Sequence, residues 1–141
     1  MVDKALVLRK IAELEEYLSQ INEYQKVTVQ QYEGDWKLQR IVERTLQMMI
    51  ETCVDIAGHI ISDQQHRIPK SYAESFRVLA EEKMLGESLS QSMERMAKFR
   101  NIVVHHYDRV DAHIVVRILK KHLEDFLDYK KAILLILKQN N

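Results

Sequence analysis

Reactive side chains are concentrated in residues 100–107, which read RNIVVHHY. Arg100 carries a planar guanidinium that stays charged and matches the shape of a phosphate. His105 follows five residues later, and histidine is the side chain that takes up and releases protons near neutral pH. Tyr107 adds a phenol hydroxyl two residues further on. This combination predicts phosphate binding next to acid–base chemistry.

The spacing between Arg100 and His105 sets a condition on the structure around them. Five residues of a regular helix turn through about 500°, so the two side chains point about 140° apart. They converge only if the helix ends between them or if both face a cleft shared with a second subunit. Spacing alone leaves another interpretation open, in which Arg100 is a surface cation near a helix C-terminus. His105 would then be buried or half-buried, and Tyr107 would be a packing aromatic.

Helix-breaking residues are scarce and divide the chain into helical stretches, since only three Gly and one Pro occur in 141 residues. Apolar residues recur every three or four positions, which is typical of amphipathic helices. The predicted helical stretches are 3–31, 36–63, 71–80, 88–99 and a last helix from about 112 onward. The segment 100–111 is the least regular, although the fourth helix could continue into it by a turn. The prediction is an all-α fold, an antiparallel four-helix bundle with one additional short helix, forming a single domain over 1–141.

Residues suited to helix N-termini support these boundaries. Asp35 is positioned to accept hydrogen bonds from the first free N–H groups of the second helix. Ser71 and Ser88 each begin a capping-box pattern, with Glu74 in the first case and Gln91 in the second. The last helix has two candidate caps, and these are Asp108 and Asp111.

The composition suits a soluble globular protein with a real core, because 46% of the residues are hydrophobic and 30% are charged. Equal numbers of basic and acidic residues, 21 of each, exclude a strongly basic protein that holds nucleic acid through its overall charge. The charges are nevertheless unevenly divided. Residues 1–64 carry 7 basic and 11 acidic residues, whereas residues 65–141 carry 14 and 10, with five of the six histidines. A localised site for a polyanion therefore remains open in the second half.

The single cysteine, Cys53, excludes an internal disulfide and a thiol cluster for zinc. No grouping of histidines has the spacing of metal ligands, so we expect no metal and no cofactor. The first residues, MVDKALVLRKIAELEE, mix acids with bases and lack a long apolar core. We therefore expect neither a signal peptide nor a membrane anchor, and a cytoplasmic location.

Two helices carry apolar stripes that are wider than one neighbouring helix requires. The widest places are Met48-Met49-Ile50 and residues 133–137, which read ILLIL. One interpretation is an ordinary buried core. The other is a two-fold homodimer built from these helices.

The segment FRNIVVHHYDRVD, residues 99–111, resembles the signature R-x4-H-x-Y of the HEPN superfamily, and specifically its HepT toxin branch. That branch typically reads R-N-x-x-V-H-x-Y, and the matching places are held by Arg100, Asn101, Val104, His105 and Tyr107. The likeness extends over nearly the whole chain. Residues 42–61 resemble the second helix of the family, and residues 69–80 resemble its central connection and short helix.

The resemblance implies a metal-independent endoribonuclease that works as a homodimer, with its site in the cleft between protomers. Family members are toxins of type II/VII-like toxin–antitoxin pairs and cut RNA such as tRNA or mRNA. Their partner is the nucleotidyltransferase antitoxin MntA, which transfers AMP onto the tyrosine of the signature, here Tyr107. No membrane is involved.

The resemblance also implies a role for each residue of the signature. Arg100 would bind the scissile phosphate, and His105 would act as acid or base when the RNA 2′-OH attacks the adjacent phosphorus. Asn101 would orient the histidine or the phosphate. His106 lies at the variable place and could substitute for His105, because R-x5-H is also tolerated among HEPN proteins.

Two other functions fit the same residues. The first is a catalytically silent HEPN module that partners a nucleotidyltransferase and holds a nucleotide or substrate with its Arg, His and Tyr. The second is a plain helical scaffold. Cleavage of RNA by the purified protein separates the nuclease from both.

Overall fold

A computed structural model describes residues 2–140, and these residues form helices joined by turns and short loops, with no strand among them. The long helices are α1 (Lys4–Ile21), α3 (Trp36–Asp63), α4 (Tyr72–Glu81), α5 (Glu87–His105), α6 (Ala112–Arg117) and α7 (Leu123–Gln139). A π-helix, Ile118–His122, joins α6 to α7, so that the two form one continuous arm. Shorter pieces are α2 (Val29–Glu33) and two 3₁₀ turns, Asn22–Tyr24 and Tyr107–Arg109. The predicted all-α class is confirmed.

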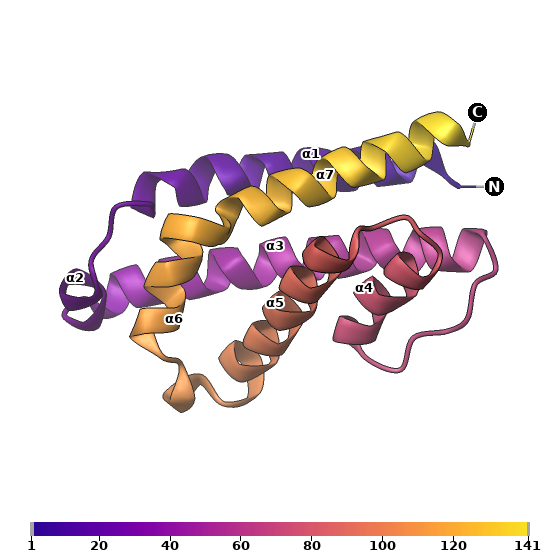
Figure 1. Cartoon of the computed structure of the whole chain (residues 1–141). Coiled ribbons are helices and arrows are strands. Elements are labelled where there is room, and N and C mark those ends of the chain that lie inside the picture. Colours follow the sequence, from indigo (N-terminus) through magenta and orange to yellow (C-terminus); the bar gives the residue numbers. More distant parts are fainter. Residues whose placement is uncertain (1, 141) are drawn as a thin grey trace.

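Helix α3 is the centre of the bundle. Figure 1 shows α1 and α7 side by side along one side of α3, with α4 and α5 along the other, and α3 contacts α1, α4 and α5. The broad apolar stripe predicted for α3 is buried on both sides, from Val42 to Ile61. Tyr129 of α7 joins the layers: its hydroxyl donates to the carbonyl of Cys53 at 2.8 Å, and its ring meets Phe76 edge-on at 5.6 Å between centroids. A buried hydroxyl with a partner avoids the cost of leaving that group without one.

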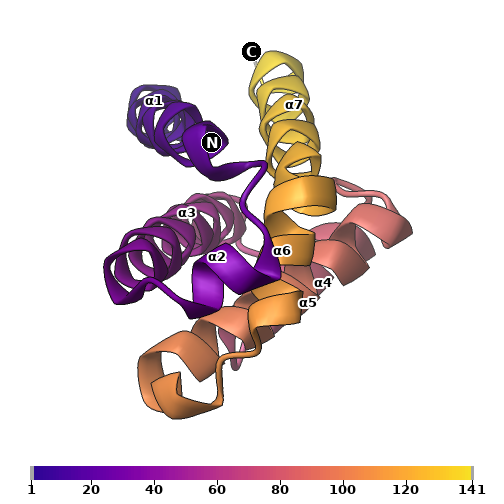
Figure 2. The same cartoon turned by 90° about the vertical axis from the view of Figure 1, so that its left-hand side faces the viewer.

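The segment between α5 and α6 lies at the edge of the bundle. In both Figure 1 and Figure 2, this connection lies on the side of the molecule away from α1 and α7. The last residues of the signature are in this connection, so they are not covered by the main helical layers.

Two predicted helix starts are confirmed and two boundaries are wrong. Asp35 caps α3 by accepting from the N–H groups of Lys37 and Leu38, and Ser71 caps α4 by accepting from Glu74. The first helix is shorter than predicted, because Thr28 forms a reciprocal capping box that begins α2 after α1 has ended. The predicted cap at Ser88 is wrong, because α5 begins at Glu87 and Ser88 already lies inside its first turn.

Of the two candidate caps for the last helix, Asp111 is the one used, and it accepts from the N–H of His113 at 2.8 Å. Among the described residues, no helix combines the length and the hydropathy needed to cross a bilayer.

The wide apolar stripes are used mainly for the core. Met49 and Ile50 of α3 are fully buried, which fits the interpretation of an ordinary core for that helix. The α7 stripe is divided. Ile133, Ile136 and Leu137 are buried, but Leu127, Leu134 and Leu135 are exposed by 41%, 36% and 58%. Met48 of α3 is only partly buried, and the homodimer face stays a prediction.

Candidate functional site

Arg100 is held by a carboxylate from the central helix. Its Nε donates to Oε2 of Glu51 at 2.8 Å, and its Nη2 lies 2.8 Å from the same oxygen. The amide of Gln47, one turn earlier on α3, donates to that oxygen at 3.1 Å. Only 15% of the Arg100 side chain is exposed. Hydrogen bonds between charged groups are shorter and stronger than neutral ones, so this pair fixes the direction of the guanidinium.

Two further contacts complete the surroundings of Arg100. Its Nη1 donates to the Asn101 side-chain oxygen at 3.2 Å, and its guanidinium carbon lies 4.7 Å from the centre of the Tyr72 ring on α4. A cation over an aromatic face is attracted by the electron-rich ring. Because Nη1 and Nη2 carry two N–H groups each, the guanidinium retains donors for an anion. Asn101 therefore contacts Arg100, and its orienting role toward the histidine or the phosphate stays a prediction.

His105 and His106 stand in the open at the end of α5. His105 is the last residue of that helix, and His106 leaves helical geometry with φ −141° and ψ 49°. Both side chains are exposed. The position suits a group that must reach a substrate and exchange protons with it. The interpretation of His105 as a buried or half-buried histidine is wrong.

Tyr107 lines a hollow in which Arg100 takes no part. Its side chain is 75% exposed, so it is not a packing aromatic. Arg40, Arg44, Gln47 and Val103 are among the residues that line the hollow with it, and the volume is about 560 Å³. A phenol hydroxyl in the open can be reached by another enzyme.

The carboxylate in this hollow belongs to Glu43, and it is hydrogen-bonded to a buried tyrosine, Tyr32. The hydroxyl of Tyr32 donates to Glu43. Burial and this neighbouring carboxylate together raise the pKa of Tyr32 far above its usual range, so the hydroxyl stays protonated and remains a donor. Arg40 lies over the Trp36 ring at 5.4 Å. Neither Arg40 nor Arg44 forms an ion pair with a carboxylate within residues 2–140.

A single protomer does not bring Arg100 and His105 together. Helix α5 runs without interruption through both residues, so it does not end between them. Five residues of helix leave the two side chains about 140° apart. Arg100 points toward α3 and α4, and His105 is exposed at the helix end. Of the two routes to convergence that the spacing allows, the structure removes the first, and a shared cleft with a second subunit stays a prediction.

Sequence reasoning assigned no role to Glu51 or Tyr72. One signal for Glu51 was available, because it is a charged residue within a stretch of α3 whose neighbours Ile50, Thr52 and Cys53 are all buried. A carboxylate in such a place requires a partner. No comparable signal exists for Tyr72, because its contact depends on how α4 packs beside α5.

The remaining nucleophiles and metal-binding side chains contribute no second site. Burial raises the pKa of the Cys53 thiol, which keeps it protonated and unreactive. The His66 ring lies 2.8 Å from the Glu82 carboxylate and 3.0 Å from the Gln64 side-chain oxygen. Within residues 2–140, no three His, Cys, Asp or Glu side chains are grouped closely enough to hold a metal ion.

Comparison with known proteins gives a consistent result. The family model for ribonuclease HepT-like proteins matches residues 14–133. The mRNA nuclease HepT of Shewanella oneidensis is 36% identical over 121 residues, which cover 86% of this chain and 90% of that protein. The tRNA nuclease HepT of Aphanizomenon flos-aquae is 25% identical over 145 residues, which cover 99% of this chain and 97% of that protein.

Solved structures show the same relationship. The tri-AMPylated HEPN toxin of Shewanella oneidensis, in complex with its MNT antitoxin, superimposes with a TM-score of 0.85 at 35% identity and covers 96% of this chain and 99% of that one. A toxin–antitoxin structure with AMP-PNP superimposes with a TM-score of 0.87 at 34% identity and covers 93% and 98%. The chain therefore belongs to the ribonuclease HepT-like family, the ribonuclease toxins of the HEPN superfamily.

Proposed function

We propose that the chain is a cytoplasmic, metal-independent endoribonuclease toxin in which Arg100 and His105 cut RNA, and that a nucleotidyltransferase antitoxin silences it by adenylylating Tyr107. One observation supports this best: α5 carries a guanidinium fixed by Glu51 and, one and a half turns later, an exposed imidazole. The likeness to HepT nucleases over most of the chain supports the same reaction.

In this reaction the RNA supplies its own nucleophile. The 2′-oxygen forms a bond to the adjacent phosphorus while the bond from phosphorus to the 5′-oxygen breaks, leaving a 2′,3′-cyclic phosphate and a free 5′-hydroxyl. His105 accepts the proton of the 2′-OH, and an acid returns a proton to the departing 5′-oxygen. A proton-transfer group in place contributes about 10²–10⁴-fold to the rate. Arg100 stabilises the extra negative charge on the phosphorane, and its fixed direction means that little reorganisation is needed.

The site requires two chains. Because Arg100 and His105 of one α5 point about 140° apart, a phosphate held by one guanidinium is best reached by the imidazole of the second copy. A two-fold dimer creates two such pairings, and its two His105 side chains can also divide the acid and base roles.

Adenylylation of Tyr107 fits its surroundings. The phenol oxygen would attack the α-phosphorus of ATP, lose its proton and release pyrophosphate. The transferred AMP adds a negative phosphate close to Arg40 and Arg44, which line the same hollow and lack carboxylate partners among the described residues. A nucleotide fixed there, two residues from His105, blocks RNA by both bulk and charge.

The decisive experiment is incubation of the purified chain, without its partner, with total RNA and tRNA in the presence of EDTA. Cleavage should occur and should disappear in both Arg100→Ala and His105→Ala. Arg9→Ala and His113→Ala are matched controls, because both residues are exposed and lie outside the signature. The absence of cleavage by unmodified protein that still binds the nucleotidyltransferase would favour the alternative, a binding module without catalysis.

A further inference from the structure

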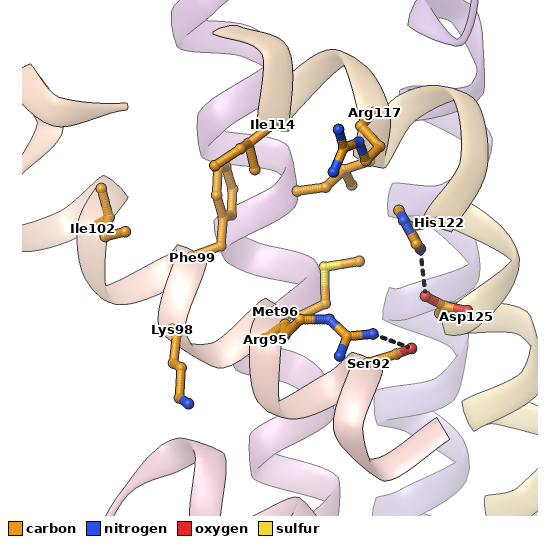
Figure 3. A pocket seen from close by; sticks show the side chains of 11 residues that line it. Ser92, Arg95, Met96, Lys98, Phe99, Ile102, Ile114, Arg117, His122 and Asp125 are labelled. Carbon is orange, nitrogen blue, oxygen red and sulfur yellow. Dashed lines mark hydrogen bonds and ion pairs between the residues drawn. The ribbon is translucent and has the colours of Figure 1, made fainter. Parts of the chain in front are cut away.

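An apolar pocket of about 300 Å³ lies between α5 and the arm formed by α6, the π-helix and α7. Its floor consists of buried side chains, Met96, Phe99 and Ile118. Ile102 and Ile114 line its walls and are exposed by 36% and 44%. Figure 3 shows the Phe99 ring directly below Ile114. The volume is at the small end of the range for sites that bind small organic molecules.

Cations surround this pocket, and none of them has a carboxylate partner within residues 2–140. Arg95, Lys98 and Arg117 line it, and all three are exposed. Arg95 donates to the hydroxyl of Ser92 at 3.2 Å. In Figure 3, Arg95 lies on the opposite side of the hollow from Arg117. The one acid in the lining is Asp125, which lies 3.1 Å from His122. An apolar hollow with a cationic rim favours a ligand that is flat and apolar in one part and anionic in another.

Two other arginines, Arg67 and Arg77, are neutralised. Arg67 contacts both Glu74 and Glu81, and Arg77 contacts both Glu87 and Glu94. The cations around the pocket therefore differ from those that hold α4 and α5 in place. Their charge remains available to an incoming anion.

The pocket opens on the side of α5 that carries His105. Residues three, four and seven apart lie on one face of a helix. Lys98, Ile102 and His105 have these spacings, so they form one row, whereas Arg100 points about 140° away from His105. The end of this row is the proposed proton-transfer group, and Ile102 is one helical turn before it.

The π-helix contributes Ile118 to the floor of the pocket and His122 to its wall. Such segments insert one residue into an α-helix, are rare, and occur frequently at functional sites. The inserted turn is the place where the α6–α7 arm changes direction beside α5 in Figure 1. The π-helix therefore indicates a binding site independently of the charges on the rim.

We propose that this pocket holds one base of the RNA beside the cleaved phosphodiester, with Arg95 and Arg117 on the flanking phosphates. The proposal rests on the proposed ribonuclease function and adds to it a subsite that selects bases. A base has an apolar face for the floor and is linked to phosphates on both sides, which the rim cations can attract. A second copy packed over the whole pocket would bury Arg95, Lys98 and Arg117, which have no carboxylate partners among the described residues, and this desolvation cost disfavours that occupant.

Binding can be measured without cleavage by using 2′-O-methyl oligonucleotides, in which the attacking hydroxyl is blocked. The probes are fluorescent single strands about eight nucleotides long, one for each base, and an abasic strand of the same length and charge. At least one base-containing strand should bind the unmodified protein about tenfold more tightly than the abasic strand. Ile102→Ala and Ile114→Ala should remove most of this difference, and Ile68→Ala, at a residue that is 85% exposed and does not line the pocket, should retain it.

The rim has its own test. Arg95→Gln and Arg117→Gln should weaken binding of the base-containing and abasic strands alike and reduce the dependence on salt, whereas the exposed Arg9→Gln should do neither. Equal affinity for abasic and base-containing strands would overturn the proposal. So would a change of the sedimentation coefficient in the pocket variants without a change in binding, because the face would then be a contact between copies. Pocket-dependent binding by a protein that fails to cut RNA would uphold the subsite and refute the nuclease.

Discussion

The two ends of the signature differ in how firmly the protein holds them. Arg100 is 15% exposed and is oriented by Glu51, Asn101 and the Tyr72 ring. His105 is exposed at the helix end, and Tyr107 is 75% exposed. The phosphate-binding cation is thus preorganised, while the groups that must meet a proton or a second enzyme are left accessible. Modification at the open end can silence the site without moving Arg100.

The largest expected effects are on RNA cleavage, and only at the Arg100 end should stability fall as well. His105→Ala should slow RNA cleavage by about 10²–10⁴-fold and change the free energy of unfolding by less than about 0.5 kcal/mol. Arg100→Ala should slow cleavage to a similar extent and also reduce the free energy of unfolding by about 1–3 kcal/mol, because Glu51 loses its partner. Cleavage of labelled RNA and urea unfolding followed by circular dichroism measure the two quantities.

His106→Ala is the matched control, because His106 is equally exposed and adjacent to the proposed base. It should retain cleavage within about threefold of the parent. If His106→Ala is inactive and His105→Ala is active, the roles of the two histidines are reversed. If Arg100→Ala unfolds at the same urea concentration as the parent, the contrast between a held end and an open end is wrong.

A mixed dimer tests whether the Arg100 and the His105 that act together belong to different chains. Two copies with different affinity tags, one Arg100→Ala and the other His105→Ala, are coexpressed and the mixed dimer is isolated through both tags. A cleft in which Arg100 of one protomer faces His105 of its partner leaves one of two sites intact. About half of the parent activity should then return. A pairing within one chain returns none, and neither does a single shared cleft that needs both histidines.

The contrast between the two ends also explains how much of the fold and of the site can be predicted from the sequence. The helices follow from apolar spacing, and the starts of α3 and α4 follow from Asp35 and Ser71, because these signals are local. The exposure of His105 could not be predicted, because it depends on α5 ending where no helix covers it. The contacts of Arg100 depend on residues 49 and 28 positions earlier. The π-helix interrupts a sequence whose spacing of apolar residues gives no sign of it.

A smaller effect is expected from the residue that holds Arg100. Glu51→Gln keeps the shape of the side chain and weakens a charge-assisted bond, so Arg100 is oriented less firmly. Cleavage should fall by about tenfold, mainly in kcat, and the free energy of unfolding should fall by about 1 kcal/mol. Glu15→Gln is the matched control, because it breaks the surface pair of Glu15 with Lys130 and should change neither quantity measurably. A Glu51→Gln protein with unchanged kcat and lower affinity would assign Glu51 to RNA binding instead.

The smallest effect on cleavage is expected at Tyr107, although the effect on regulation is complete. Tyr107→Phe removes only an exposed hydroxyl, so RNA cleavage should stay within about twofold of the parent. When the protein is coexpressed with its nucleotidyltransferase, the intact mass of the parent should increase by whole AMP units, and that of Tyr107→Phe should not. Tyr24→Phe, at a half-buried tyrosine in the turn after α1, should gain the same mass as the parent. Because the proposed block acts beside His105, the modified parent should lose cleavage but keep its urea midpoint. A lower midpoint on modification would mean that adenylylation acts by loosening the contacts of Arg100, and the two ends of the signature would then not be independent.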